Sequence, residues 1–381
     1  MAGMQVLIIG GGVVGLSTAC ALGSAGHAVQ LVERERTGSR ASWVAAGLLT
    51  PSTPWRYPPA LIDLCRRSEA LYPAFVEQLL RHTGHDAQLQ TAGMLYPEGV
   101  TFSAPLVAEH RARRNALGFE VQALDRVALD ALQPGLGHAV SGAAWQPVSS
   151  RVRPPRLLAG LRARALQLNV SLLEQCAVES LSRVRGAVSG VRLANGQELG
   201  ADAVVLAAGA WSGLLAQSVE LELPVRPVRG QILLLSGPPG LLGPVINDGD
   251  CYLVPRRDGR LLVGSTMEDA GFDAVTTDDA LARLRRLATS LLPASAGLPV
   301  ESSWAGLRPA TLDRMPYLGA VPDVPGLVLA TGHFRNGILL APVTAALVTD
   351  VLDGREPAVD LSPFACREVD PEASLGLAAS S

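Results

Sequence analysis

The sequence contains no lysine: all 32 residues counted as lysine or arginine are arginine. Catalysis through a lysine Schiff base, pyridoxal phosphate chemistry and phosphate transfer on a P-loop each need a lysine side chain. The tyrosine–lysine pair of short-chain dehydrogenases is absent for the same reason. These reaction classes are therefore excluded, whatever the origin of the bias toward arginine.

Cysteine and clustered positive charge are also scarce. The five cysteines are odd in number, lie far apart and include no C-x-x-C pair, so we expect neither a disulfide framework nor a zinc site. This use of cysteine favours a reducing compartment. The formal net charge is −3 and no run of basic residues occurs, so the sequence gives no support for nucleic-acid binding.

One long apolar run, Val6–Leu22, could be mistaken for a signal peptide or a membrane segment. No basic residue precedes it and glycines interrupt it. We therefore expect a cytoplasmic protein with no integral membrane segment. The 381 residues, 48% hydrophobic and 18% charged, are enough for two domains with a large buried core.

The same run contains a dinucleotide-binding fingerprint. Gln5–Ile9 is typical of a short strand, and the G-x-G-x-x-G turn formed by Gly10, Gly12 and Gly15 leads into a helix. The three glycines permit a tight turn, close approach of a pyrophosphate and close packing of helix on strand. Glu33 ends the next predicted strand, where it can accept a hydrogen bond from a ribose hydroxyl. We therefore predict a nucleotide cofactor.

Two arginines near the C-terminus lie among apolar, glycine and proline residues. Arg308 belongs to the stretch Trp304–Pro316, and Arg335 to the stretch Gly332–Pro342. Such surroundings are unusual for solvated cations, and a guanidinium matches a carboxylate with two parallel hydrogen bonds. A buried structural ion pair is the alternative for Arg308. Together, the predicted nucleotide cofactor and a carboxylate clamp made of arginine indicate a redox enzyme that acts on a small acid.

The order of predicted elements indicates an α/β fold that is interrupted by a β-rich lobe. Gly230–Leu235, Cys251–Pro255 and Leu261–Ser265 are typical of antiparallel strands. Ala341–Leu352 is predicted as a closing helix, and Leu106–Leu117 as a surface helix whose charges are solvated. We expect a Rossmann-like cofactor domain with an inserted α+β lobe that carries an antiparallel sheet.

Motifs in these segments resemble those of the D-amino acid oxidase superfamily of FAD enzymes. The resemblance starts from the glycine fingerprint with Glu33, the loop Ala46–Leu48 and the segment Ala208–Ser212. Within the superfamily, the chain closely resembles the glycine oxidases of bacterial thiamine biosynthesis, from about residue 4 to residue 357. The features that carry this closer resemblance are Ser42–Leu49 with Pro54–Tyr57, Cys251–Arg256, Gly264–Met267, Trp304–Pro309 and Gly332–Gly337.

The order of the predicted elements indicates two discontinuous domains, and the serine-, alanine- and glutamate-rich composition after about Pro363 indicates a tail. The expected parts are an FAD-binding domain (1–86, 149–222 and 306–362), a substrate-binding domain (87–148 and 223–305) and a disordered tail (363–381).

The resemblance also implies which residues contact FAD. His333 is expected to contribute through its backbone, as part of a loop along the flavin ring. Relatives that bind FAD covalently use a cysteine between the two arginine motifs, and this interval has none, so we expect non-covalent FAD. The residues implied to bind the cofactor are Gly10, Gly12, Val13, Val14, Gly15, Glu33, Arg34, Ala41, Ser42, Ala46, Gly47, Leu48, Val178, Gly209, His333, Phe334, Arg335, Asn336, Gly337, Ile338 and Leu339.

For the substrate, the resemblance implies that Arg308 holds the carboxylate, that Tyr252 shares this task, and that Arg335 and Met267 line the site. The implied reaction is oxidative deamination of glycine, sarcosine or small D-amino acids by hydride transfer from Cα to flavin N5. Its products are the imine or glyoxylate, ammonia and hydrogen peroxide. The sequence departs from some relatives at Asp250, where they carry histidine, and this acid is either a surface residue or an influence on substrate preference.

The implied partners are a small amino acid, dioxygen and a thiazole synthase that receives the imine, within a homotetramer. Three alternatives stay open. The first is a dehydrogenase or oxidase of the same fold that acts on sarcosine, a D-amino acid or proline. The second is an NAD-dependent dehydrogenase, and the third is a flavin-binding protein without turnover.

Overall fold

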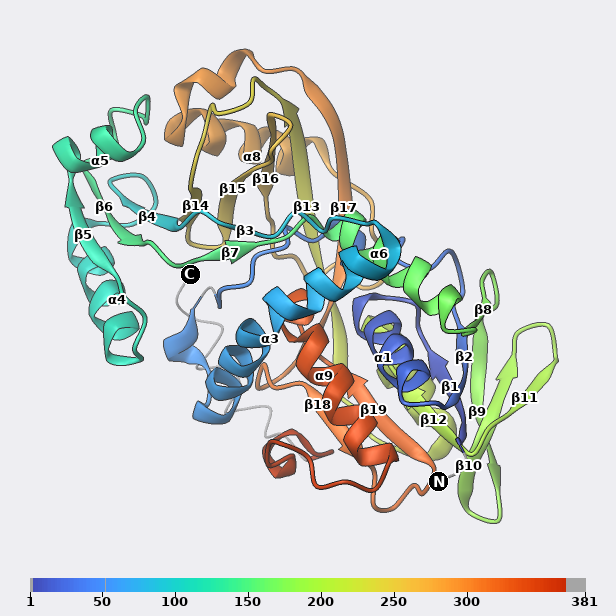
Figure 1. The fold of residues 1–381 in the computed structure, drawn as a ribbon. Helices are drawn as coiled ribbons and strands as arrows, with labels where there is room; N and C mark the ends of the chain where they lie inside the picture. The colour runs from blue at the N-terminus through green and yellow to red at the C-terminus, as the bar shows by residue number, and fades with distance from the viewer. Residues whose placement is uncertain (1–2, 52, 368–381) are drawn as a thin grey trace.

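The structure is a computed structural model that describes residues 3–51 and 53–367. A mainly parallel sheet lies at one end of the molecule and an antiparallel sheet at the other (Figure 1). All pairs in the first sheet are parallel except that of its edge strand β18 with β19. Across this sheet the strands are β18 (Tyr317–Ala320), β19 (Leu327–Thr331), β12 (Ala203–Leu206), β1 (Gln5–Ile9), β2 (Ala28–Val32) and β8 (Ser171–Leu173).

The alternation of side chains along β1 divides the first domain into layers. Val6 and Ile8 face a helical layer, whereas Leu7 and Ile9 face a second apolar cluster on the opposite side. The helical layer consists of α1 (Val13–Ser24), α3 (Pro59–Thr83), α6 (Pro154–Gln167) and α9 (Gly337–Leu352). The opposite layer consists of β9 (Val178–Val184), β10 (Ala187–Leu193), β11 (Glu198–Gly200) and α7 (Ser212–Ala216).

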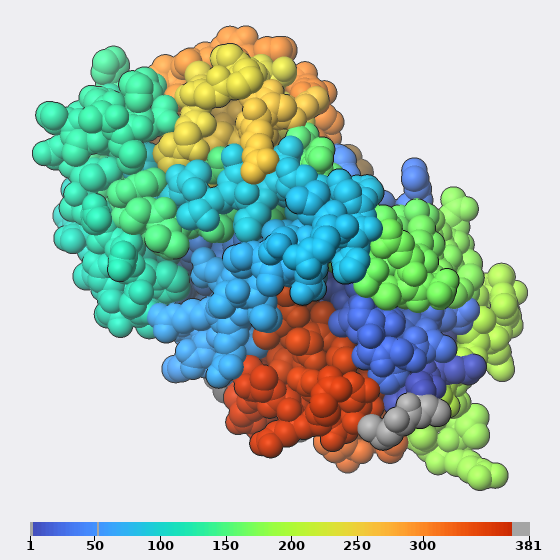
Figure 2. Space-filling view, viewed as in Figure 1, coloured from blue at the N-terminus to red at the C-terminus, as the bar shows by residue number. Residues whose placement is uncertain are grey.

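The two ends of the chain meet in the helical layer. Helices α1 and α9 pack against each other in front of the parallel sheet (Figure 1). In the space-filling view the C-terminal part, in red, lies directly beside the N-terminal part, in blue (Figure 2). The first βα unit is therefore completed by the last helix, which closes the core of this layer.

The antiparallel sheet is covered on one face by α8 (Asp278–Leu291), whose Leu284, Ala288 and Leu291 are buried in its apolar cluster. Only the pair β14–β4 is parallel among the described strands of this sheet. The strands lie in the order β17 (Val300–Thr311), β13 (Val225–Ser236), β16 (Arg260–Gly264), β15 (Cys251–Pro255), β14 (Val245–Asp248), β4 (Met94–Glu98), β6 (Gly142–Gln146) and β5 (Gln122–Asp125).

The remaining elements are short or lie at the periphery. They are α2 (Ala41–Val44), α4 (Ala104–Ala116), α5 (Arg126–Leu132), the strand pair β3 (Gln90–Thr91) and β7 (Ser150–Arg151), and the 3-10 turns Pro54–Arg56, Gly209–Trp211, Gln217–Val219, Pro293–Gly297 and Ser362–Phe364. In the described part of the chain, no helix combines the length and apolarity that crossing a bilayer requires.

The predicted fold class is confirmed, since a parallel-sheet domain carries a second, antiparallel sheet. The domain bounds stay a prediction. The closing helix starts four residues earlier than predicted, at Gly337 instead of Ala341. Pro342 has no N–H to donate to the carbonyl of Ile338, and the hydroxyl of Tyr72 on α3 donates to that carbonyl instead. The helix therefore continues through the proline.

Two further expectations are corrected by burial. Arg114 on α4 was predicted as part of a solvated face, but it is fully buried, with its guanidinium carbon 4.2 Å from the centre of the Tyr96 ring. The predicted disordered tail begins too early, because Phe364 is fully buried and Arg367 forms an ion pair with Asp313. Residues 368–381, the rest of that predicted tail, lie outside the described residues.

Candidate functional site

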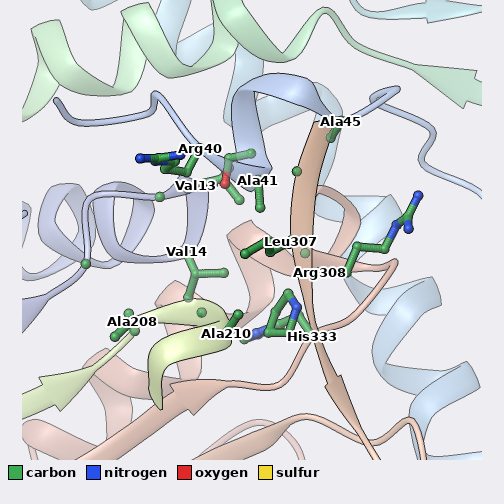
Figure 3. A pocket seen from close by; sticks show the side chains of 18 of the residues that line it. Val13, Val14, Arg40, Ala41, Ala45, Ala208, Ala210, Leu307, Arg308 and His333 are labelled. Carbon is green, nitrogen blue, oxygen red and sulfur yellow. Dashed lines mark hydrogen bonds between the residues drawn. The ribbon is translucent and has the colours of Figure 1, made fainter. Parts of the chain in front are cut away.

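A cavity of about 420 Å³ lies between the two sheets. Its volume falls within the roughly 300–1,000 Å³ of small-molecule and cofactor sites. One wall is formed at the carboxyl ends of β1, β2, β12 and β19, and the other by residues of β13, β15 and β17. In Figure 3, Arg308 and His333 lie at one side of this cavity, whereas Arg40, Val14 and Ala208 lie at the other.

The glycine fingerprint forms the first part of the cavity. Gly10 has a φ of +106°, and a Cβ there would lie 2.4 Å from the carbonyl oxygen of Ala207. A Cβ on Gly15 would lie 1.9 Å from the carbonyl oxygen of Gly10, so only glycine allows this packing. The N–H of Val13, at the start of α1, donates to Ser42 Oγ at 2.9 Å. This arrangement fits a pyrophosphate at the positive end of a helix.

Glu33 lines the cavity just beyond the end of β2. Its two carboxylate oxygens accept hydrogen bonds from the N–H groups of Gly11 at 2.7 Å and Glu35 at 2.9 Å. These bonds fix the carboxylate while leaving acceptor capacity for the hydroxyls of a ribose. Next to it, the guanidinium of Arg34 stacks on the ring of Trp211 at 3.7 Å, which closes this end of the cavity.

The loop Ala46–Leu48 is held against the cavity by a residue from the other domain. Arg256 donates to the carbonyl oxygens of Ala46 at 2.8 Å and Val152 at 3.0 Å. Burial lowers the pKa of Arg256 to about 9, and neighbouring arginines contribute. A Cβ on Gly47 would lie 2.2 Å from the carbonyl oxygen of Val152, so the loop needs glycine there. Ala46 and Gly47 thus keep their part of the cavity wall free of large side chains.

The start of α9 forms the floor of the cavity beneath Arg308. Gly337 and Ile338 line the cavity, and the first amides of a helix have no partner within it. No side chain caps this end of α9. The N–H of Phe334 donates to the carbonyl oxygen of Pro309 at 2.9 Å, which ties the preceding loop to β17. This end of the helix therefore offers N–H donors to a group that carries negative charge.

His333 is buried next to this floor and is not placed to act as a base. Its Nε2 lies 3.0 Å from Thr344 Oγ1. Burial lowers the pKa of His333 to about 4, so the imidazole is neutral near pH 7. The prediction that this residue contributes through its backbone is consistent with that state.

Arg308 lies at the opposite end from Glu33, on β17. Its Nη2 donates to Ser265 Oγ at 2.6 Å and its Nη1 to the carbonyl oxygen of Thr266 at 3.1 Å. A Cβ on Gly230 would lie 2.2 Å from this guanidinium, so glycine on the neighbouring strand gives it room. Burial lowers the pKa of Arg308, while the nearby Tyr252 raises it. Among residues 3–51 and 53–367, no carboxylate forms an ion pair with Arg308.

Arg335 also lines the cavity but carries a different set of contacts. Its Nη1 donates to a carboxylate oxygen of Asp250 at 2.7 Å and lies 3.7 Å from the sulfur of Met267. The Asp250 side chain is 47% exposed, so this ion pair lies at the mouth. The two arginines that the sequence singled out thus share one cavity, and only one of them is paired.

The structure brings nearly all of the predicted site residues to this cavity. Gly15, Met267 and Leu339 are the predicted residues that do not line it. Gly15 acts through packing, Met267 sits beside Arg335 at the mouth, and the carbonyl of Leu339 accepts a hydrogen bond from Ser68 inside the helical layer. Residues that line the cavity but were not predicted include Ser39, Arg40, Ala45, Cys176, Ala177, Gly230, Ser265, Gly306 and Thr331.

One signal for the missed residues was present in the sequence. Gly230 and Gly306 are directly opposite each other on β13 and β17, and they leave room for the guanidinium of Arg308 and for Val44 of α2 next to the cavity. Glycine in the interior of a strand often marks a close approach of ligand or backbone. From the motif Gly264–Met267 the resemblance implies only Met267 as a site residue, whereas in the structure Ser265 contacts Arg308.

The donor set fits a flavin dinucleotide and does not fit a metal. Glycines at Gly10, Gly12 and Gly47 keep the cavity wall flat, Glu33 faces the ribose end, and the start of α9 offers amides at the other end. Among the described residues, no group of three or more histidine, cysteine, aspartate or glutamate side chains could hold a metal ion.

The fold and the cavity together define the class of protein, a dinucleotide-binding oxidoreductase. Residues of its antiparallel sheet form the second wall of the cavity. Residues 5–351 match the family model of FAD-dependent oxidoreductases, and the chain belongs to this family. It is therefore an FAD-dependent enzyme, and the predicted cofactor is confirmed.

Similar proteins agree with the resemblance seen in the sequence. Glycine oxidase of Pseudomonas putida is 41% identical over 98% of this chain and 99% of its own length. The crystal structure of glycine oxidase from Geobacillus kaustophilus, 33% identical, superposes with a TM-score of 0.91 over 97% of this chain and 100% of that one. The bifunctional protein ThiO/ThiG of Synechocystis sp. is 37% identical over 91% of this chain but only 51% of its own length.

We predict that Gly15→Ala weakens FAD binding at least about tenfold, which corresponds to about 1.4 kcal/mol. The added methyl group would collide with the carbonyl oxygen of Gly10 and push the glycine turn away from the pyrophosphate. Titration of the apoprotein with FAD, followed by flavin fluorescence, measures this. Gly297→Ala is the matched control, because a Cβ there meets nothing within 4 Å. Equal FAD affinity in the two variants would contradict the assignment.

We also predict that His333 makes the fold sensitive to acid. The unfolded chain binds a proton at this imidazole below about pH 6.5, whereas the folded chain does so only near pH 4. Folding stability therefore falls as the pH drops through this window, by on the order of 2 kcal/mol at pH 5. Urea unfolding at pH 7 and pH 5 should show a smaller loss for His333→Asn, while the exposed control His138→Asn should behave like the wild type. Equal losses of stability in the wild type and both variants would exclude His333 as the origin of the acid sensitivity.

Proposed function

We propose that the protein oxidises glycine and other small amino acids, including sarcosine and small D-amino acids, with dioxygen as the electron acceptor. The products would be the imine or glyoxylate, ammonia and hydrogen peroxide. The observation that carries this proposal is the guanidinium of Arg308, which shares a cavity with the FAD-binding residues and has no carboxylate partner within the described part of the chain. A substrate carboxylate would supply that partner.

The surroundings of Arg308 suit a small substrate. Ser265 and Thr266 hold the guanidinium from one side, and Tyr252, only 7% exposed, stands next to it. A carboxylate between Arg308 and the Tyr252 hydroxyl would receive charge-assisted hydrogen bonds from both. Because both groups come from rigid strands, the bound acid would be held in one orientation. That orientation decides which bond of the substrate faces the cofactor.

The same cavity lacks a base for proton abstraction at Cα. Glu33 is the one carboxylate among the described residues that line it, and it lies at the ribose end. His333 is neutral and bonded to Thr344. FAD, when bound, supplies a two-electron acceptor for a hydride from Cα. The residues of the chain therefore act by binding and orientation, and the lone pair of an unprotonated substrate amine assists loss of the hydride.

FAD itself would be held by two helix ends and two loops. Ser42 and the start of α1 would face the pyrophosphate, Glu33 the ribose, and the loop Ala46–Leu48 and the first turn of α9 the ring system. The cofactor would be non-covalent, since no cysteine lies between Arg308 and Arg335. It should be released into the supernatant when the protein is precipitated with acid.

The names of similar proteins support the substrate and suggest its use. The Pseudomonas putida and Geobacillus kaustophilus proteins are glycine oxidases, and in Synechocystis sp. the matching region is fused to a second protein. We propose that the imine is passed to a thiazole synthase in thiamine biosynthesis, in the cytoplasm, by a homotetramer. A dehydrogenase of the same fold is the second candidate, which would reduce its flavin equally well but react slowly with dioxygen.

We predict that the purified, FAD-loaded protein releases hydrogen peroxide with glycine or sarcosine, and less with D-alanine. Peroxide formation separates an oxidase from a dehydrogenase. The rates of peroxide release with the three substrates give the order of substrate preference. A flavin that bleaches under anaerobic conditions without peroxide in air would indicate a dehydrogenase. A flavin that none of these substrates bleaches would contradict the proposed substrate class.

We further predict that Arg308→Leu weakens substrate binding by about 2–5 kcal/mol, the scale for loss of one partner of a buried charge pair. The KM for glycine, or the substrate concentration that half-saturates anaerobic flavin reduction, should rise by at least about 30-fold. Arg226→Leu is the control, because its side chain is 59% exposed and pairs with Asp269 away from the cavity. An unchanged KM in Arg308→Leu would show that this residue is no carboxylate clamp.

A further inference from the structure

The mouth of the cavity holds an ion pair that the proposed chemistry does not use. Arg335 Nη1 and a carboxylate oxygen of Asp250 lie 2.7 Å apart. The Arg335 side chain is only 16% exposed, whereas that of Asp250 is 47% exposed. The acid therefore meets solvent while the guanidinium that it neutralises faces inward, beside Arg308.

Asp250 is held in this place by the fold. It follows Gly249 in the tight turn between β14 and β15, where Gly249 has a φ of +75°. The ring of Phe102 packs against this turn, and a Cβ on Gly249 would lie 3.0 Å from it. The preceding residue, Asp248, accepts a hydrogen bond from the Thr101 hydroxyl at 2.5 Å. Thr101 and Phe102 thus hold the turn in place, and its acid accepts a hydrogen bond from Arg335.

The charges around the mouth are unequally compensated. Arg335 lies near enough to influence both Arg308 and Arg314, and Asp250 acts on all three arginines. Arg335 donates a hydrogen bond to this carboxylate. Arg308 has no ion-pair partner among residues 3–51 and 53–367 and can receive one substrate carboxylate, whereas the charge of Arg335 is already matched by Asp250.

We propose that Asp250 determines substrate specificity by occupying Arg335, so that the site accepts acids with one carboxylate and rejects those with two. This inference rests on the proposed function, since it takes Arg308 as the first carboxylate clamp. Without Asp250 the cavity would present two guanidiniums, and a short dicarboxylate could bridge them. With Asp250 in place, a second carboxylate must displace an acid that is covalently fixed at its position and meets repulsion from it.

The test compares ligands that differ by one carboxylate. Methoxyacetate and diglycolate are ether analogues of sarcosine and iminodiacetate, and neither has an amine to be oxidised. Their dissociation constants follow from the change in flavin absorbance on titration of the FAD-loaded protein. The same comparison can be made in turnover with iminodiacetate and its monoamide, which have nearly the same shape but differ in charge.

In the wild type we expect diglycolate to bind more weakly than methoxyacetate. Asp250→Asn keeps the size of the side chain and removes its charge, and should improve diglycolate binding relative to methoxyacetate at least about tenfold. Asp250→Glu should retain the wild-type preference. Adding Arg335→Met to Asp250→Asn should abolish the gain, because Arg335 would be the second clamp. Asp130→Asn, which breaks the similarly exposed pair of Arg126 and Asp130, is the matched control and should change nothing.

An unchanged ratio of the two dissociation constants in Asp250→Asn would overturn the inference. An equal gain in diglycolate binding in Asp250→Asn and in the double variant with Arg335→Met would overturn the inference as well. The effect of Asp250 would then be general charge repulsion at the mouth of the cavity. Failure of the proposed function is recognised separately. In that case neither glycine nor sarcosine reduces the flavin, while the ratio of the two analogues still reports on Asp250.

Discussion

The arrangement of the site depends on the half-buried guanidinium of Arg308, which pairs with no carboxylate in the part of the chain that the structure describes. A cation removed from water needs compensation, and Arg308 receives only part of it from Ser265 and Thr266. Its place requires a glycine on the neighbouring strand, since any Cβ on Gly230 would collide with it. The sheet is thus shaped around a charge that, in the proposed function, the carboxylate of the substrate would pair with. The other features of the cavity limit which ligand this can be.

Strand β17 links this charge to the cofactor. Its pairing with β13 places Gly306 opposite Gly230, and α2 packs so closely on β17 that a Cβ on Gly306 would lie 2.3 Å from Val44. The same strand accepts the N–H of Phe334 through Pro309, just before α9 begins. The positions of Arg308 and of the amides at the start of α9 are therefore set by one strand. A shift of β17 would therefore move Arg308 and the start of α9 together.

Features that depend on local sequence were predicted, and features that depend on distant contacts were not. The glycine turn from Gly10 to Gly15 follows from steric rules within a few residues, and both flanking strands match the prediction. The start of α9 could not be predicted in this way, because the partner that satisfies the helix around Pro342 is Tyr72, on another helix. Burial of Arg114 likewise rests on rings from separate segments. For the site, motifs indicated which residues gather, but not that Asp250 would pair with Arg335.

The absence of lysine has a consequence for the chemistry of the site. A guanidinium is charged at neutral pH, so a carboxylate clamp made of arginine would keep its charge there. The buried imidazole of His333, with a pKa of about 4, is also silent near neutral pH. If hydride loss requires an unprotonated amine, a rise of activity with pH above neutrality reflects the substrate's own ammonium group. The protein would then act by orienting the substrate and by fixed charge, and the pH dependence would come from the ionisation of the substrate amine.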